Sequence, residues 1–103
     1  MSVMEVARVT IDPTRSQQFE EVFREAITLV QAASGHRGSR LVRDVENPGT
    51  YLFLVRWDDL ADHVDRFAES EAFGRFESLI GPFLRAAPEV THVESDDVEE
   101  VVR

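Results

Sequence analysis

Two residues of this 103-residue chain have side chains and a spacing that could do chemistry: Trp57 and His63. An indole N–H donates hydrogen bonds, and an imidazole can take up or release a proton near neutral pH. Trp57 is expected to end a strand and His63 to lie one turn into the next helix, so a tight connection would bring both to the same end of a sheet. Both also have a structural interpretation, Trp57 as a core residue closing a strand and His63 as a hydrogen-bonded core histidine.

The remaining composition argues against a metal or cofactor site. His36, His63 and His92 do not lie at the i,i+4 spacing of helical metal ligands, and the chain has no cysteine. It also lacks a glycine-rich phosphate loop and contains no lysine. We therefore expect no metal, flavin or haem. His36, in a turn, and His92, in the last strand, are interpreted as structural or solvent-facing.

The charge of the chain excludes two classes of partner. Twenty acidic residues against eleven basic ones give a formal charge of −9, and a surface of that sign repels nucleic acids and anionic membranes. The chain has no apolar run near the ~20 residues that span a bilayer, and its first residues lack the pattern of a signal peptide. We expect a cytoplasmic protein that binds neither nucleic acid nor membrane.

The elements that must position these residues begin with a strand and a helix. Residues 3–11 are rich in β-branched types and end at Asp12-Pro13, a pair that suits a helix N-cap and first helical position. The apolar residues that follow recur at intervals of three and four, as on one face of an amphipathic helix. This face comprises Phe19, Val22, Phe23, Ala26, Ile27, Leu29, Val30 and Ala33. Ser34-Gly35 is expected to end the helix, with Gly35 in the left-handed conformation.

The second half of the sequence predicts a hairpin, a helical region and a last strand. Residues 38–45 and 50–57 read as strands joined by a Pro-Gly loop at 46–49. Asp58 or Asp59 can cap a helix, and Ser70 can cap a second one that Gly81-Pro82 ends or kinks. The faces of these helices comprise Leu60, His63, Val64 and Phe67, and then Phe73, Phe76, Leu79, Ile80 and Phe83. Residues 90–94 follow as the last strand.

The order strand, helix, strand, strand, helix, strand is that of an α+β, ferredoxin-like βαββαβ domain with a four-stranded antiparallel sheet. Two helices would cover one face of the sheet, and the other face would carry the apolar residues Val6, Leu52 and Leu54. A second copy of the chain is the economical cover, so we expect a homodimer. The domain is expected to span residues 1–95.

Residues 96–103 are expected to form an acidic C-terminal tail. Acidic residues crowd the end of the chain, and a like-charged run is usually solvated. The alternative is a short swapped strand through Val98, Val101 and Val102.

The order of four motifs resembles the antibiotic biosynthesis monooxygenase family. These motifs are the strand 51–57 ending in Trp57, the segment 58–63 ending in His63, the helix start Ser70-Glu71-Ala72-Phe73, and Pro88-Glu89-Val90. The resemblance covers roughly residues 3–95. It implies a dimeric α/β barrel with a ligand cavity in each subunit, between the sheet and its helices. Some members oxygenate phenolic or quinol-type aromatics with dioxygen and without a cofactor, and another branch degrades haem.

The resemblance assigns roles to five residues. Trp57 matches a tryptophan that lines the cavity, where its N–H could donate to a substrate oxygen, and His63 matches a Tyr or His that could act as acid or base. A planar substrate could then stack among Phe53, Phe67 and Phe76. Trp57 and His63 are thus the candidate catalytic residues, and the three phenylalanines are the candidate substrate-binding residues.

Two departures from the family pattern limit the functions that the resemblance implies. Phe53 stands where the aromatic oxygenase branch can carry an asparagine. A side chain that could hydrogen-bond the substrate is therefore replaced by one that can only pack against it. Ala7, Phe67 and Glu77 stand at the positions of the Asn, Trp and His set of the haem-degrading branch, which argues against haem degradation.

The sequence therefore supports two hypotheses. The first is a cofactor-independent monooxygenase acting on a small aromatic or quinol-type substrate with dioxygen. The second is a catalytically silent dimeric barrel that binds an apolar small molecule. A cavity reaching His63 would favour the enzyme, and a filled interior would favour the silent dimer.

Overall fold

A computed structural model describes residues 1–96 of the chain. The predicted acidic tail and the alternative swapped strand therefore lie, apart from Asp96, outside the described residues.

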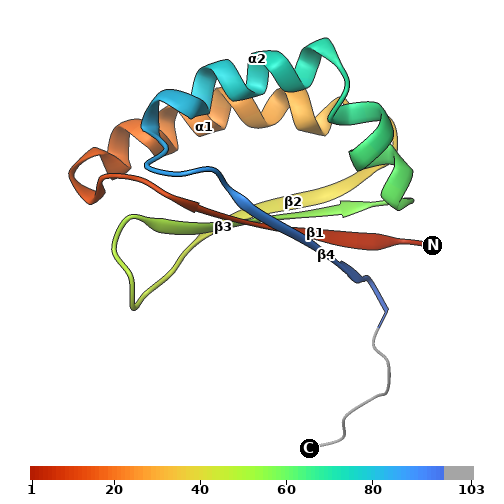
Figure 1. The fold of residues 1–103 in the computed structure, drawn as a ribbon, viewed down its shortest axis with the longest axis horizontal. Coiled ribbons are helices and arrows are strands. Elements are labelled where there is room, and N and C mark those ends of the chain that lie inside the picture. The colour runs from red at the N-terminus through yellow and green to blue at the C-terminus, as the bar shows by residue number, and fades with distance from the viewer. Residues whose placement is uncertain (97–103) are drawn as a thin grey trace, which may run out of the picture.

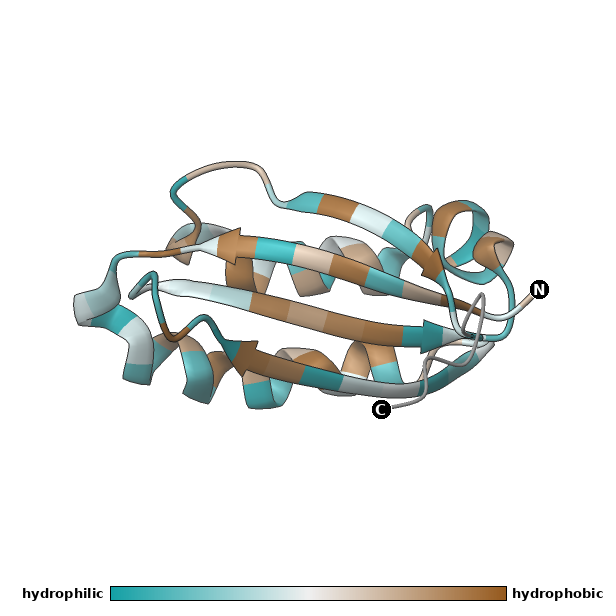
Figure 2. Ribbon diagram, turned by 90° about the horizontal axis from the view of Figure 1, so that it is seen from below, coloured by the Kyte–Doolittle hydropathy of each residue, from teal (hydrophilic) through white to brown (hydrophobic). Residues whose placement is uncertain are grey.

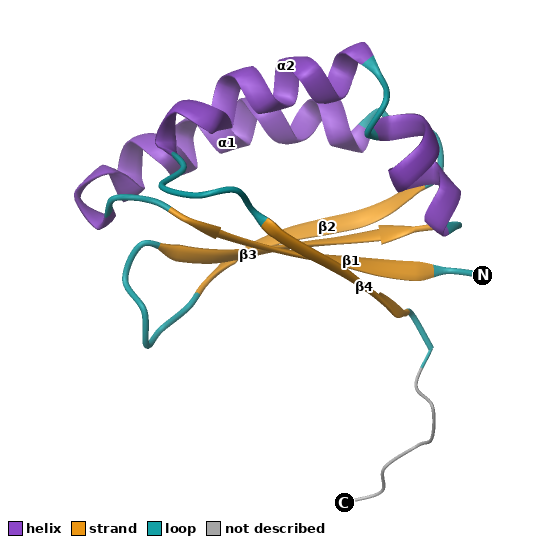
Figure 3. Ribbon diagram, in the orientation of Figure 1, coloured by secondary structure: helices purple, strands orange, loops and turns teal. Residues whose placement is uncertain are grey.

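Four strands and two main helices make up two layers (Figures 1 and 3). The elements are β1 (Val3–Thr10), η1 (Pro13–Arg15), α1 (Ser16–Gln31), β2 (His36–Arg43), β3 (Thr50–Trp57), η2 (Asp62–Phe67), α2 (Glu71–Ile80), η3 (Gly81–Phe83) and β4 (Glu89–Glu94). The strands form one antiparallel sheet in the order β2-β3-β1-β4. The predicted ferredoxin-like α+β fold is confirmed.

Local signals in the sequence fix the start of η1, which leads directly into α1, and the turn that follows α1. The Asp12 carboxylate accepts a hydrogen bond from the Thr14 N–H at 2.9 Å, as expected of an N-cap before Pro13. The helix ends at Gln31, earlier than the predicted end at Ser34-Gly35, and a turn follows in which Gly35 has φ +85°. Because this turn is tight, β2 begins already at His36, which lies in the strand and not in a turn as predicted.

The segment after β3 differs from the predicted α-helix. Residues Asp62–Phe67 form a π-helical turn, in which the Ala68 N–H donates to the His63 carbonyl five residues earlier at 2.8 Å. His63 and Phe67 are buried as predicted, whereas Leu60 and Val64 are 41% and 38% exposed. The wider turn explains the difference, because residues spaced for an α-helix no longer share one face.

The second helix begins and ends where the sequence predicted. The Ser70 hydroxyl accepts a hydrogen bond from the Phe73 N–H at 3.2 Å, which caps α2. Gly81 and Pro82 convert the chain to the short helix η3, and Phe76 and Ile80 are buried against the sheet. The Phe76 ring packs against Phe53 of β3 and Phe23 of α1.

Alternation along β1, and along β3 from Tyr51 onward, separates the two faces of the sheet. Val3, Glu5, Ala7 and Val9 on β1 are buried beneath the helices, and so are the odd-numbered residues of β3. The register Val6↔Leu54 places these two residues, with Leu52, on the opposite face. Figure 2 looks onto this face, where apolar segments run through the middle of the sheet and no helix within residues 1–96 covers them.

Candidate functional site

The site lies in a cavity of about 490 Å³ between the inner face of the sheet and α2. Strand β1 forms its floor, α2 and η3 form its roof, and the segment before β4 forms one edge. Most of the lining is apolar, and its titratable side chains are Glu5, His63 and Glu77. The volume falls within the usual range for small-molecule sites.

Glu5 is the unusual residue of this cavity, because it is a carboxyl group at a buried position of the central strand. Its Oε1 atom accepts a hydrogen bond from the Trp57 indole N–H at 3.1 Å. Burial raises the pKa of Glu5 from 4.5 to about 7, and the Trp57 hydrogen bond opposes part of that rise. Glu5 therefore changes charge close to neutral pH.

His63 packs on Trp57 and faces Glu5. The two rings stack with centroids 5.4 Å apart, and the His63 Nε2 atom lies 3.5 Å from the Glu5 Oε1 atom. Burial, followed by the proximity of His92, lowers the pKa of His63 from 6.5 to about 4. At neutral pH the His63 ring is therefore uncharged, and one of its nitrogens can accept a proton.

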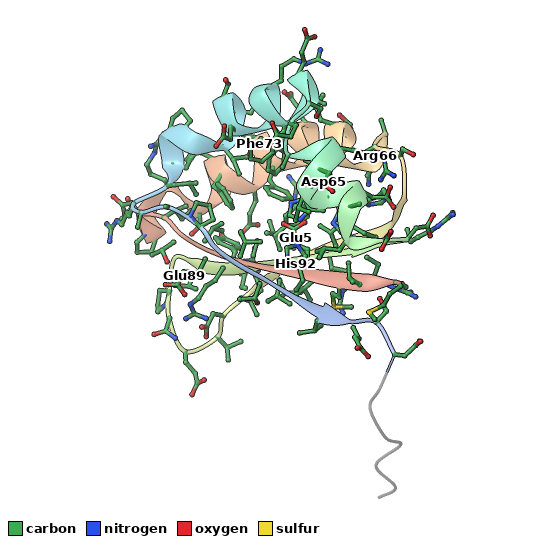
Figure 4. The ribbon with its side chains drawn as sticks, turned by 45° about the vertical axis from the view of Figure 1, so that its right-hand side comes forward. Glu5, Asp65, Arg66, Phe73, Glu89 and His92 are labelled. Atoms are coloured by element: carbon green, nitrogen blue, oxygen red, sulfur yellow. The ribbon has the colours of Figure 1, made fainter. Side chains whose placement is uncertain are left out.

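His92 completes the cluster from the neighbouring strand. It is the register partner of Glu5 across the β1–β4 pair, and Figure 4 shows the two residues next to each other. The His92 Nε2 atom lies 2.7 Å from the His63 Nδ1 atom, which is a direct hydrogen bond between the rings. Burial also lowers the pKa of His92. The sequence predicts a structural or solvent-facing His92, and in the structure it is the partly exposed hydrogen-bond partner of His63.

This cluster is a chain of polar contacts, in which Trp57–Glu5 and His63–His92 are hydrogen bonds and His63 lies 3.5 Å from Glu5. The His63 Nδ1 and His92 Nε2 atoms are in direct contact at 2.7 Å, the distance of a hydrogen bond between two neutral rings. Within residues 1–96 no group of three or more His, Asp or Glu side chains is arranged to hold a metal ion. The chemistry that this arrangement can perform is proton transfer.

The structure brings the five predicted site residues into one region, but only three of them line the cavity. His63, Phe53 and Phe76 line it, and the rings of Phe53 and Phe76 stack with centroids 6.0 Å apart. Trp57 and Phe67 do not line it: Trp57 is 0% exposed, and Phe67 packs against Trp57 with centroids 5.8 Å apart. Because the Trp57 N–H already donates to Glu5, Trp57 acts on the cavity through that carboxyl group.

Sequence reasoning missed Glu5 and His92. A signal for Glu5 was present, because a carboxylate alternates with Val3, Ala7 and Val9 on what must be the inner face of a strand. Buried carboxyl groups are rare unless they are paired or functional. The partnership with His92 depends on the register of two strands more than 80 residues apart, which no local pattern specifies.

A second hollow, of about 610 Å³, lies between α1 and β2 and is larger than the first. Its carboxylate, Glu20, accepts hydrogen bonds from Arg43 and from the Tyr51 hydroxyl, and Arg24 and Arg40 also line it. Phe23 and Phe53 line both hollows and so form the wall between them. The cluster of Glu5, His63 and His92 lies on the other side of that wall, and we therefore place the site in the smaller cavity.

The chain is similar to proteins of one family. The profile of the family described as "Antibiotic biosynthesis monooxygenase" matches residues 2–78. The uncharacterized protein YczJ of Bacillus subtilis strain 168 is 31% identical over 90 residues, which are 87% of this chain and 95% of that protein.

Solved structures share the fold over nearly the whole chain. A protein of Bordetella bronchiseptica assigned to the antibiotic biosynthesis monooxygenases is 28% identical, with a TM-score of 0.87 over 92% of this chain and 97% of that one. SnoaB, a cofactor-independent oxygenase from Streptomyces nogalater, is 18% identical, with a TM-score of 0.78 over 94% of this chain and 95% of that one. At that identity the second likeness concerns the fold alone.

Proposed function

The chain belongs to the antibiotic biosynthesis monooxygenase family, and we propose that it is a cofactor-independent monooxygenase acting with dioxygen on a small aromatic or quinol-type substrate. The observation that carries this proposal is the cavity of about 490 Å³ that reaches His63. A filled interior would have favoured a silent barrel.

The reaction requires little from the protein beyond a pocket and acid–base groups. For a substrate RH₂, one oxygen atom of dioxygen enters to give RO and the other leaves as water with the two hydrogen atoms. All electrons come from the substrate, which must first lose a proton to become a good electron donor. Removing that proton is the task of the site, and His63 is one of the acid–base groups that lie at the cavity.

The lining of the cavity supports a flat, uncharged substrate. Phe53 and Phe76 offer stacking faces, and Phe73 adds a third ring at the same cavity. The acidic side chains that line it are those of Glu77 and Glu5, and Glu5 carries a charge above its pKa of about 7. A carboxylated aromatic would be repelled there, whereas a phenol could donate its O–H to an acceptor.

A homodimer is part of the same proposal. The face of the sheet that carries Val6, Leu52 and Leu54 is apolar in its middle, and the helices lie on the other face. A second copy packed sheet against sheet would remove this surface from water and form the α/β barrel of the family.

Oxygen consumption across a panel of quinols and phenols tests the proposal. We expect uptake with at least one uncharged quinol, and we expect one labelled oxygen atom from ¹⁸O₂ in the product. Uptake should persist in protein treated with chelators and freed of flavin. Tight binding of aromatics without any uptake would instead support the silent barrel.

A further inference from the structure

We propose that Glu5 takes the proton released by the substrate, and that His63 and His92 carry protons between Glu5 and the solvent beside β4. This inference rests on the proposed function and specifies how its site handles the proton. It makes Glu5 a catalytic residue and gives His92 a role outside the cavity.

Glu5 is placed to meet a substrate hydroxyl directly. Its side chain lines the cavity, and the Trp57 N–H holds its Oε1 atom from the side of β3 at 3.1 Å. In the transfer, the O–H bond of the substrate breaks and an O–H bond forms on the Glu5 carboxylate, while the electron pair stays on the substrate oxygen. The base strength of Glu5 favours this role over His63, whose pKa is about 4 against about 7 for Glu5.

A buried carboxylic acid must lose its proton again before it can serve the next substrate, and His63 provides the route. The Nε2 atom of His63 lies 3.5 Å from Glu5 Oε1, and its Nδ1 atom lies 2.7 Å from His92 Nε2. When the Glu5 proton moves to Nε2, the Nδ1 proton can move on to His92, so the imidazole stays neutral before and after. His92 then releases the proton on its own Nδ1 atom to water. The same path in reverse can supply a proton when water is formed.

The exit lies away from the substrate. His92 does not line the cavity, and it is partly exposed on β4, an edge strand of the sheet. Protons can therefore enter and leave while a substrate fills the cavity and excludes water from it.

The surroundings of Glu5 contain few other charges. His92 faces it from β4, His63 from η2 and the neutral Trp57 from β3, and Glu77 on α2 lines the same cavity. The residues that line the cavity include no arginine. The proton on Glu5 is thus governed by burial and by the Trp57 hydrogen bond, and the chain Glu5–His63–His92 is a polar path from this carboxyl group to the surface.

Proton exchange at Glu5 can be observed without turnover, with benzene filling the cavity in place of the substrate and excluding water from it. In ¹³C-glutamate-labelled protein, the Glu5 carboxyl signal, assigned with Glu5→Gln, should move continuously with pH around a midpoint of about 7. In His92→Ala the exchange between protonated and charged forms should slow by at least ~10-fold, so that the signal broadens or splits. Added imidazole, which can occupy the vacated site, should restore the single moving signal.

His36→Ala is the matched control. His36 also contacts Trp57, edge-on with centroids 6.1 Å apart, but it hydrogen-bonds to Ser39 and lies off the proposed path. It should leave the Glu5 signal unchanged. Unchanged exchange in His92→Ala, slowing that imidazole does not reverse, or a Glu5 midpoint near 4.5 would each overturn the relay.

Turnover separates this inference from the proposed function. With a quinol that is oxidised, Glu5→Gln should lower kcat by about 10²–10⁴-fold, the usual loss for a general base. A protein that passes the exchange test and oxidises no quinol would contradict the monooxygenase proposal and leave the relay standing. Full turnover in Glu5→Gln would contradict the role of Glu5 alone.

Discussion

The rings of Trp57 and His63 stack nearly parallel, with centroids 5.4 Å apart and an angle of 6° between their planes. Trp57 meets Glu5 through its N–H, and His63 meets the same carboxyl oxygen through Nε2. The stack therefore fixes two groups around one buried carboxyl group, and the predictions below separate their contributions.

The stability of the protein should depend on pH in opposite ways through Glu5 and His63. Folding raises the pKa of the Glu5 carboxyl group, so Glu5 lowers the free energy of unfolding as the pH rises from 4.5 to about 7. Folding lowers the pKa of His63, so His63 lowers the free energy of unfolding as the pH falls from 6.5 to about 4. Between these limits the two effects oppose each other in the wild type.

Single variants should reveal each effect. Between about pH 5 and pH 6.5, stability should rise with pH in Glu5→Gln and fall in His63→Phe, each by about 2 kcal/mol relative to the wild type. Urea unfolding at several pH values measures this, with the exposed Glu69→Gln as a control for lost charge. Parallel pH profiles in all four proteins would refute it.

Replacing Trp57 with phenylalanine should raise the pKa of Glu5 further, because the Trp57 hydrogen bond favours the charged carboxylate. The smaller ring should also cost about 1–3 kcal/mol of stability. Phe67→Leu removes volume beside Trp57 and leaves the N–H in place, so it should lower stability without shifting the Glu5 titration. The carboxyl ¹³C signal measures this, and equal shifts in both variants would show that packing sets the pKa.

His63→Ala should lower turnover by about 10²–10⁴-fold while the protein stays folded, if His63 transfers protons in the reaction. A purely structural His63 would give a lower melting temperature and unchanged ligand binding per folded molecule. Kinetics and thermal unfolding of this one variant distinguish the two roles. Unchanged turnover of an oxidised quinol would end the case for His63.

Replacing Leu54 with aspartate should convert a dimer to monomers, because a carboxylate buried at a sheet interface costs several kcal/mol. Leu60→Asp adds the same charge to an exposed position near η2 and should leave the dimer intact. Sedimentation at micromolar concentration measures both. A wild-type protein that is a stable monomer would remove the barrel from the proposal.

Most of the fold could be predicted because its signals are local. The Asp12 cap, the Ser70 cap and the Pro-Gly loop at 46–49 each depend on a few neighbouring residues. The π-helical turn could not be predicted, because the spacing of Leu60, His63, Val64 and Phe67 fits an α-helix.

The site could be predicted only in part for a similar reason. Trp57 and His63 are close in sequence, and the resemblance to a family pointed to both. Glu5 and His92 meet across a strand pair whose register depends on the whole sheet. The sequence could have marked Glu5 as an inward-facing carboxyl group, but the chain of contacts to His92 required the folded arrangement.

The π-helical turn at Asp62–Phe67 makes the site sensitive to chain length as well as to residue type. Deleting one residue there would allow the segment to close into an ordinary α-helix, and residues on one side of the deletion would rotate by about 100° relative to those on the other. A family member one residue shorter in this turn could keep both a Trp and a His and yet have its imidazole directed elsewhere. The length of this turn is therefore a criterion for deciding which relatives share the site, alongside the identity of the side chains.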